Sequence, residues 1–297
     1  MPTGESVAPV IPGRPATAPV RPLAGRTDTY KATPTQGYQE TSMRYFVTSN
    51  DERQEQRWER ELGDRGFDVA TDYDTETIIV TLGGDGSILH AARTYPEPTI
   101  LPVRTGGSKG HRTTLERDQL VETLERIDTG SAGEAYTTTA HRKIAAYRDG
   151  TELAGEFRAL NEISLHHSSA ILAAIFTVRI RDRDEAFAFE RVIGDGVLVA
   201  TPFGSTGYYR SITDGTFTEG LGIAFNNVHT PVEIPSYAVL SRDAVVEVEL
   251  VESDHASSAV LTRDNDEQMY ELPVGEPVEI HATDETVEIL QPTQSTP

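Results

Sequence analysis

Three short polar segments carry residue types suited to binding phosphate and sugar groups. The first is Gly83-Gly84-Asp85-Gly86, which follows an apolar β-branched run at 78–82 and precedes a helical pattern. Glycines in such a turn let a phosphate approach main-chain N–H groups, and the start of the helix adds partial positive charge. Asp85 could position Mg²⁺ or accept a proton from an attacking hydroxyl. The alternative is a structural turn in which Asp85 caps the helix, because the turn lacks the Lys of a Walker A loop.

The second segment is Asn161-Glu162, a polar pair inside the otherwise apolar stretch 160–163. Buried polar groups require partners, so such a pair in a strand is unusual. Strand alternation predicts that the two side chains lie on opposite faces, one toward a ligand and the other toward a loop. A polar pair at the edge of a strand is the alternative interpretation.

The third segment, 194–209, reads Gly-Asp-Gly, then an apolar strand, a Thr-Pro turn and a helix start rich in hydroxyl groups. Ser205 and Thr206 can donate to and accept from a base or a phosphate, and Tyr208 can stack on a ring. In the alternative interpretation, this is a strand–turn–helix unit in which Ser205 or Thr206 serves only as the N-cap.

A fourth segment concentrates positive charge in an acidic chain. Arg104, Lys109 and Arg112 follow the predicted strand at 100–103 within a glycine-rich loop. We predict that this cluster contacts phosphate, and a solvated loop is the alternative. His166 and His167 are adjacent on a predicted strand and therefore point to opposite faces, so we expect no zinc site there.

The elements that must position these segments change in type along the chain. From residue 43 to 134 strands alternate with helices, which predicts a parallel α/β domain. From 135 to 297 strands dominate, and an Asp149-Gly150 turn indicates a hairpin; we expect a mostly antiparallel domain whose last residues return to the first. Residues 1–42 are rich in Pro, Thr, Ala and Gly and are predicted to be disordered. The predicted strands are 43–49, 67–70, 78–82, 100–103, 143–148, 152–159, 176–181, 186–192, 221–225, 244–250, 258–261, 278–281 and 287–290, and the predicted helices are 52–62, 87–95, 118–127 and 205–212.

The charge balance restricts the partners and the environment. The chain has 47 acidic and 26 basic residues, a net charge of −21, and only three lysines. Acidity, arginine in place of lysine and the absence of cysteine are typical of a cytoplasmic protein from a salt-loving organism, because carboxylates stay hydrated where salt screens their repulsion. An ordinary acidic protein is the alternative interpretation. We find no basic face for nucleic acid. We also find no secretory signal and no apolar run of the ~20 residues that a membrane-spanning helix requires.

In order and spacing, these segments resemble the NAD kinase family. That family carries Gly-Gly-Asp-Gly, then Asn-Glu, then Gly-Asp-Gly followed by Thr-Pro-x-Gly-Ser-Thr-Ala-Tyr. The resemblance covers about residues 43–285 and includes Asp264-Asn265, where the family often has Asp-Gly. The first turn alone is shared with diacylglycerol kinases and phosphofructokinases, so the segment 194–208 makes the resemblance specific.

The resemblance implies a Rossmann-like parallel α/β domain joined to a β-rich domain, and phosphoryl transfer from ATP or another donor to the 2′-hydroxyl of the adenosine ribose of NAD. Asp85 would assist the transfer, Mg²⁺ would be required, and the chain would form a homodimer or homotetramer. The implied NAD-binding residues are Asp85, Gly86, Asn161, Glu162, Asp195, Thr206, Gly207 and Tyr208. The expected phosphate-binding residues are Gly83, Gly84, Gly86, Arg104, Lys109 and Arg112. The metal-binding residues stay open.

The chain departs from the family pattern at several positions. Ser87 replaces Thr, Gly207 replaces Ala, and Phe203 replaces a small hydroxyl residue. The loop at 103–112 replaces the usual Gly-Ile-Asn and Leu-Gly-Phe sequences. Two alternatives therefore stay open: a catalytically diverged nucleotide-binding homologue, and a related lipid or sugar kinase, against which the stretch 201–208 argues.

Overall fold

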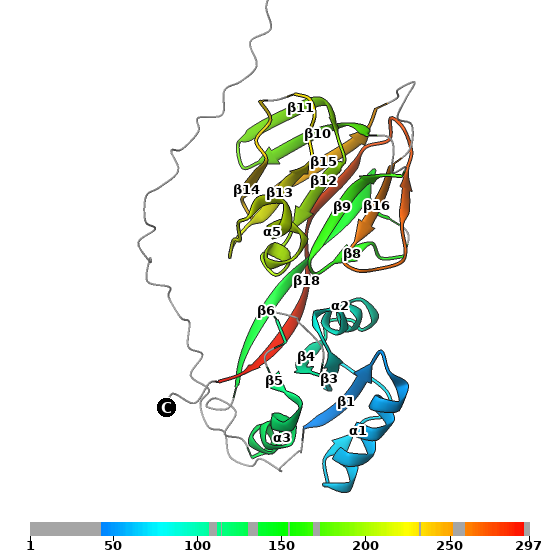
Figure 1. Ribbon diagram of the computed structural model, residues 1–297, viewed down its shortest axis with the longest axis vertical. Helices are drawn as coiled ribbons and strands as arrows, with labels where there is room; N and C mark the ends of the chain where they lie inside the picture. The colour runs from blue at the N-terminus through cyan, green and yellow to red at the C-terminus, as the bar shows by residue number, and fades with distance from the viewer. Residues whose placement is uncertain are drawn as a thin grey trace, which may run out of the picture. The chain divides into compact units, whose positions relative to one another are not determined.

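The computed structural model describes residues 43–106, 112–113, 115–129, 136–153, 155–168, 173–231, 233–251 and 259–293. The predicted disorder of residues 1–42 and the predicted role of Lys109 lie outside the described residues. The fold combines a parallel α/β portion with antiparallel sheets (Figure 1), so the predicted fold class is confirmed.

The N-terminal portion is a parallel sheet covered by helices on both faces. Alternating residues of β3 point to different helices: Ile78, Val80 and Leu82 pack in a cluster with residues of α1 and α3, while Ile79 packs with residues of α2. A strand buried on both faces needs a continuous apolar run, which 78–82 supplies. The elements are β1 (Arg44–Ser49), α1 (Glu52–Asp64), β2 (Asp68–Val69), β3 (Ile78–Gly83), α2 (Asp85–Thr94), β4 (Thr99–Arg104), β5 (Leu115–Glu116), η1 (Arg117–Gln119) and α3 (Leu120–Asp128).

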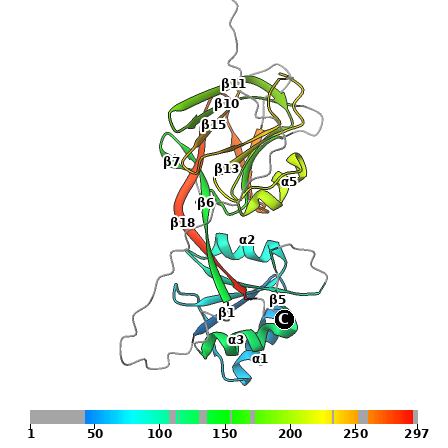
Figure 2. The same cartoon turned by 90° about the vertical axis from the view of Figure 1, so that its left-hand side faces the viewer.

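Two long strands, β6 (Tyr136–Arg148) and β18 (Val278–Pro292), connect this portion to the rest of the fold. They pair antiparallel along most of their length (Figures 1 and 2), and β18 also pairs parallel with β4. The two strands predicted at 278–281 and 287–290 are one strand, with a register shift between Ala282 and Thr286. Ser42–Pro297 forms one compact unit, and the division at 134/135 stays a prediction.

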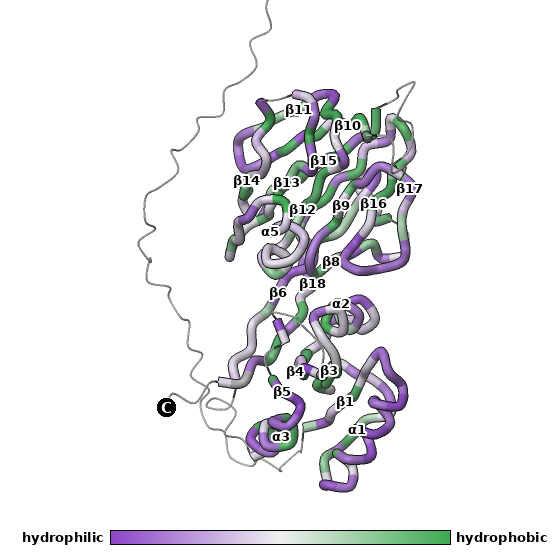
Figure 3. The backbone as a smooth tube through the Cα atoms, in the orientation of Figure 1, coloured by the Kyte–Doolittle hydropathy of each residue, from purple (hydrophilic) through white to green (hydrophobic). Residues whose placement is uncertain are grey.

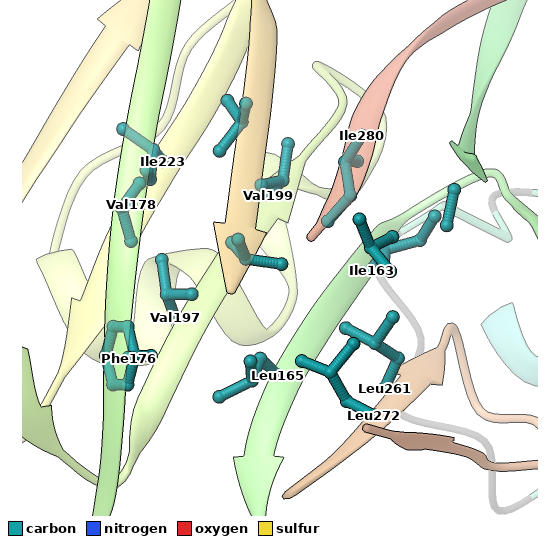
Figure 4. Close-up of a cluster of buried hydrophobic side chains, with 14 of the residues drawn as sticks. Ile163, Leu165, Phe176, Val178, Val197, Val199, Ile223, Leu261, Leu272 and Ile280 are labelled. Carbon is teal, nitrogen blue, oxygen red and sulfur yellow. The ribbon is translucent and has the colours of Figure 1, made fainter. Parts of the chain in front are cut away.

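The C-terminal portion packs two sheets of antiparallel strands against each other. Its core contains Phe176 and Val178 from one sheet and Leu165, Val197 and Ile223 from the other (Figure 4). Figure 3 shows apolar residues concentrated on these strands. The strands are β7 (Thr151–Glu152), β8 (Arg158–Ala159), β9 (Glu162–His167), β10 (Ala174–Asp182), β11 (Glu185–Gly194), β12 (Gly196–Ala200), β13 (Leu221–Asn226), β14 (Tyr237–Leu240), β15 (Val245–Leu250), β16 (Ala259–Arg263) and β17 (Tyr270–Leu272). The second sheet has the order β14-β13-β12-β9-β16-β17.

Local differences from the predicted elements have physical causes. The hairpin at Asp149-Gly150 is confirmed, and both residues have positive φ, 51° and 73°. The strand predicted at 152–159 is split into β7 and β8. The helix predicted at 205–212 consists of η2 (Gly204–Thr206) and α5 (Tyr208–Thr213), which Gly207 separates with φ −91° and ψ −124°, outside the helical region.

Candidate nucleotide site

The Gly-Gly-Asp-Gly turn begins α2 two residues earlier than predicted. Gly84 is the N-cap and Asp85 the first helical residue, and no side chain caps this helix end. A Cβ atom at Gly83 would lie 1.9 Å from Ser87 Oγ, so any larger residue there would force the Ser87 hydroxyl to move. Asp85 Oδ1 accepts hydrogen bonds from the Arg112 N–H (3.0 Å) and Thr113 Oγ1 (3.2 Å). The interpretation of Asp85 as a helix cap is therefore wrong, because its carboxylate binds another loop.

The two described arginines of the basic cluster contact main-chain carbonyls. Arg104 donates to the carbonyl of Thr113 from Nε at 3.0 Å and lies 3.7 Å from Glu116. Arg112 Nη2 donates to the carbonyl of Phe203 at 2.7 Å. These contacts hold the end of the loop in place. Phosphate contact by Arg104, Lys109 and Arg112 stays a prediction.

Asp264 holds the segment that contains Asn161 and Glu162. Its carboxylate accepts three main-chain N–H groups, from Leu160 (3.0 Å), Asn161 (2.7 Å) and Glu162 (3.2 Å). Asp264 keeps part of its residue surface exposed, but burial of the carboxylate raises its pKa despite these donors. The sequence indicates Asp264 only through its place in the family pattern. Its hydrogen bonds could not be predicted, because the three donors lie 102 to 104 positions away.

The side chains of Asn161 and Glu162 both approach Gly207. A Cβ at Gly207 would lie 3.7 Å from Asn161 Nδ2 and 3.9 Å from Glu162 Oε2. The predicted opposite orientation is wrong, because β9 begins only at Glu162 and alternation does not extend back to Asn161. The structure brings this polar pair to the turn that contains the third segment.

Glu162 is a buried carboxyl with an unsatisfied oxygen. Only 8% of its surface is exposed, and Oε2 has no hydrogen-bond partner among the described residues. Burial, with a smaller contribution from Asp264, raises the pKa of Glu162 from 4.5 to about 8. At neutral pH the side chain is therefore mostly protonated and can donate a hydrogen bond to a ligand.

The turn at 201–207 packs directly on the Asn161 main chain. Thr201 Oγ1 donates to the carbonyl of Leu160 (2.5 Å) and accepts from the Gly204 N–H (3.1 Å). A Cβ at Gly204 would lie 2.2 Å from the carbonyl oxygen of Asn161, so this approach requires glycine. Ser205 Oγ lies within hydrogen-bond distance of the carbonyls of Pro202 (2.9 Å) and Phe217 (3.0 Å) and can donate its proton to either, and no side chain caps η2 or α5. The interpretation of Ser205 or Thr206 as an N-cap is wrong.

Asp195 and Tyr208 each accept a hydrogen bond from an asparagine. Asn227 Nδ2 donates to Asp195 Oδ2 (3.0 Å), and Asn226 Nδ2 donates to the Tyr208 hydroxyl (3.1 Å). The Tyr208 ring stacks on His166, with 5.8 Å between ring centres. Tyr208, Asn226 and Asn227 line a cavity of about 510 Å³. The two asparagines were not predicted, since nothing in their local sequence marks them.

A larger cavity, of about 1550 Å³, adjoins the Thr201–Thr206 turn. Arg112, Phe203 and Thr206 line it together with His141 of β6. Burial, aided by the charge of Arg112, lowers the pKa of His141 to about 4, so this ring is neutral at pH 7. Among the described residues, no group of three or more His, Asp or Glu side chains forms a metal site. In the same part of the chain, no helix has the length and apolar character needed to cross a membrane.

The sequence comparisons agree on one family. The profile of the ATP-NAD kinase N-terminal domain matches residues 29–132. NAD kinase 2 of Bacillus licheniformis is 29% identical over 218 residues, which is 70% of this chain and 78% of that protein. NAD kinase of Methanopyrus kandleri is 30% identical over 62% of this chain and 63% of its own length. The match to the Pediococcus pentosaceus NAD kinase, 31% identical, covers 49% of this chain and about half of the relative, 52%.

Solved structures share the fold at low sequence identity. Yeast NADH kinase complexed with NADH has a TM-score of 0.69 at 14% identity, covering 87% of this chain and 86% of that one. An NAD kinase from Archaeoglobus fulgidus in complex with ATP has a TM-score of 0.64 at 19% identity, covering 84% and 94%. At these identities the similarity establishes the arrangement of elements.

Proposed function

We infer that this chain, which belongs to the NAD kinase family, transfers a phosphoryl group from ATP to the 2′-hydroxyl of the adenosine ribose of NAD, giving NADP. One observation carries the proposal. Asp85, at the start of α2, is bound by Arg112, whose side chain contacts the 201–207 turn, and that turn packs on Asn161 and approaches Glu162. The motif residues, distant in sequence, thus form a connected set.

Asp85 would accept the proton of the 2′-hydroxyl as that oxygen attacks the terminal phosphorus of ATP. The new bond is O–P, the bond to the leaving ADP oxygen breaks, and the proton goes to the carboxylate. Its two hydrogen bonds at Oδ1 hold the group in one orientation. Phosphoryl transfer depends mainly on alignment and charge stabilisation, so a fixed carboxylate at the acceptor hydroxyl is the contribution expected of the protein.

The NAD-binding role rests on the two polar side chains near Gly207, those of Asn161 and Glu162. Glu162 Oε2 has no hydrogen-bond partner among the described residues. Glu162, protonated at neutral pH, would donate to an acceptor atom of the dinucleotide, and Asn161 would bind beside it. Thr206, Gly207 and Tyr208 would hold the adenine ring, since the lack of a side chain at Gly207 leaves space against the polar pair. Asp195, held by Asn227, would complete the set.

The donor phosphates would lie at the glycine turn. Gly83, Gly84 and Gly86 expose main chain at the start of α2, where N–H groups favour anions. Arg104, Lys109 and Arg112 are the cationic candidates nearby. At high salt, where charges are screened, such local donors would contribute more to phosphate binding by this acidic protein than long-range attraction would.

A divalent metal fits the site as a partner of the substrate. Mg²⁺ commonly binds one or two protein carboxylates together with substrate phosphates, and Asp85 supplies one carboxylate beside the proposed phosphate position. Mg²⁺ would neutralise charge on the transferred phosphoryl group. We further propose a cytoplasmic, salt-adapted protein, supported by the net charge of −21 and the scarcity of lysine. The resemblance to the NAD kinase family supports the proposal that it forms a homo-oligomer.

The decisive experiment is NADP formation from NAD, ATP and Mg²⁺ in molar KCl. Diacylglycerol and sugar acceptors run in parallel test the related kinase activities, and NADH in place of NAD tests the redox preference of the acceptor. Binding of NAD without any NADP formation would instead indicate a non-catalytic homologue and overturn the proposal.

A further inference from the structure

Two departures from the family pattern, Arg112 and Phe203, contact each other. The Arg112 guanidinium carbon lies 4.6 Å from the centre of the Phe203 ring. Its Nη2 donates to the main-chain carbonyls of Phe203 (2.7 Å) and Pro202 (3.3 Å). Residues 112 and 203 are 91 positions apart, so only the tertiary structure brings the pair together.

Phe203 is itself anchored on the helix that begins with Asp85. The ring is 4% exposed and packs in one cluster with Ile88 and Leu89 of α2. The neutral ring of His141 lies edge-on to it at 4.8 Å. A planar guanidinium in this partly desolvated place gains both stacking and directional hydrogen bonds, which an ammonium group cannot reproduce.

The main chain at Arg112 also determines how Asp85 is held. Asp85 Oδ1 accepts hydrogen bonds from two neighbouring residues, from the Arg112 N–H and from Thr113 Oγ1. The Arg112 side chain attaches this short segment to residues 202 and 203. Movement of that side chain would therefore shift the two groups that orient the carboxylate.

We propose that Arg112 is a positioning residue: by binding Phe203 and the adjoining carbonyls, it aligns Asp85 with the turn on which the acceptor nucleotide sits. This proposal rests on the proposed function, in which Asp85 assists phosphoryl transfer. It assigns Arg112 a role other than the phosphate contact predicted from the sequence. The two departures from the family pattern then belong to one contact.

Two substitutions separate positioning from phosphate binding. Arg112→Lys keeps the charge and would preserve much of a phosphate contact, but it loses the guanidinium contact with the Phe203 ring and the guanidinium bonds to the two carbonyls. We expect Arg112→Lys and Arg112→Ala to lower kcat alike, by about 100-fold, as expected for a misplaced catalytic group. The KM values for ATP and NAD should change less than about threefold, since these contacts act on orientation and not on substrate binding. A near-normal Lys variant with an Ala variant of raised ATP KM would overturn the proposal in favour of phosphate contact.

The matched control is Arg148→Lys, since Arg148 also lies over an aromatic ring, that of Tyr270 at 5.8 Å, but at the hairpin of β6 and β7. It should leave kcat unchanged. Phe203→Leu tests the other partner and, combined with Arg112→Lys, should add little further loss, because both changes break one interaction. Full additivity of the two losses in kcat would contradict the proposal.

A readout without turnover keeps this test separate from that of the proposed function. Hydrogen–deuterium exchange of peptides containing residues 112 and 113 should be faster in Arg112→Lys than in the wild type, since the N–H that bonds Asp85 is released. Unchanged exchange would overturn the positioning role even if the protein makes no NADP. Faster exchange in a protein without kinase activity would leave the link between the two segments intact and reject only the proposed function.

Discussion

Two aspartates, Asp85 and Asp264, show how the same side chain serves different purposes in the two portions of this molecule. Asp85 begins a helix and accepts from the N–H of one residue and the hydroxyl of the next. Asp264 accepts three consecutive N–H groups of 160–162. The first carboxylate lies where a nucleotide is proposed to react, and the second fixes the main chain that presents Asn161 and Glu162. The role of a hydrogen-bonded carboxylate can therefore be inferred only once its donors are known.

Replacing Asp85 should give the largest effect on activity. Asp85→Asn removes the proton acceptor, so we expect kcat to fall by about 1000-fold, within the range for general-base catalysis. NAD binding, measured by calorimetry, should persist, and the free energy of unfolding should change little. Retained turnover would exclude Asp85 as the base, and the proposed functional difference between Asp85 and Asp264 would then be lost.

Replacing Lys143, which links β6 to α2 and β18, should give the largest effect on stability. Lys143 of β6 is 4% exposed and donates both to the Ala92 carbonyl near the end of α2 and to Glu285 of β18. Lys143→Met leaves Glu285 buried with Arg158 alone, so we expect unfolding to become easier by about 3 kcal/mol. Denaturant unfolding measures this change. The neighbouring Arg142→Met, at an exposed side chain, should cost less than about 0.5 kcal/mol.

Asp264→Asn should invert the pattern expected for Asp85. The amide presents a donor toward at least one of the three N–H groups, so we expect a loss of about 2 kcal/mol in the free energy of unfolding. The KM for NAD should rise because Asn161 and Glu162 lose their fixed position, while kcat should fall less than for Asp85→Asn. Asp243→Asn, at an exposed carboxylate, is the control. An unaltered KM for NAD would separate Asp264 from the nucleotide site.

Between pH 7 and pH 9, Glu162 should give the smallest effect on stability, and this effect should appear as a pH dependence. Its pKa is raised to about 8 in the folded state, so the folded protein retains a proton that the unfolded chain has already lost at neutral pH. Wild-type stability should therefore decrease as pH rises from about 4.5, and should level off above about 8. Relative to the wild type, Glu162→Gln should gain about 1.4 kcal/mol between pH 7 and pH 9. Parallel stability curves for the two proteins would show that Glu162 is ionised in the folded state.

Local pattern was sufficient for much of the architecture. The run Ile78–Leu82 has the composition of a strand buried on both faces, and the structure places it in the middle of the parallel strands. The Asp149-Gly150 turn could be predicted from the sequence, because such a turn needs residues that tolerate positive φ. The sequence predicted two strands, at 278–281 and 287–290, where the structure has one. The continuity of this strand depends on its pairing with β6 and not on local preference.

The candidate site divides in the same way. Residue types, order and spacing identified Asp85, Asn161, Glu162 and the 194–208 segment as candidates. Glycine turns and polar groups within apolar strands are unusual, and they can be recognised from the local sequence. The contacts of Asp264 with 160–162 and of Arg112 with Phe203 were decided only in three dimensions. Each joins residues about 90 to 100 positions apart, and the pKa of Glu162 depends on burial that no local pattern specifies. The order of residues therefore indicated the family and supplied the chemical groups, whereas tertiary packing determined their orientation and their protonation.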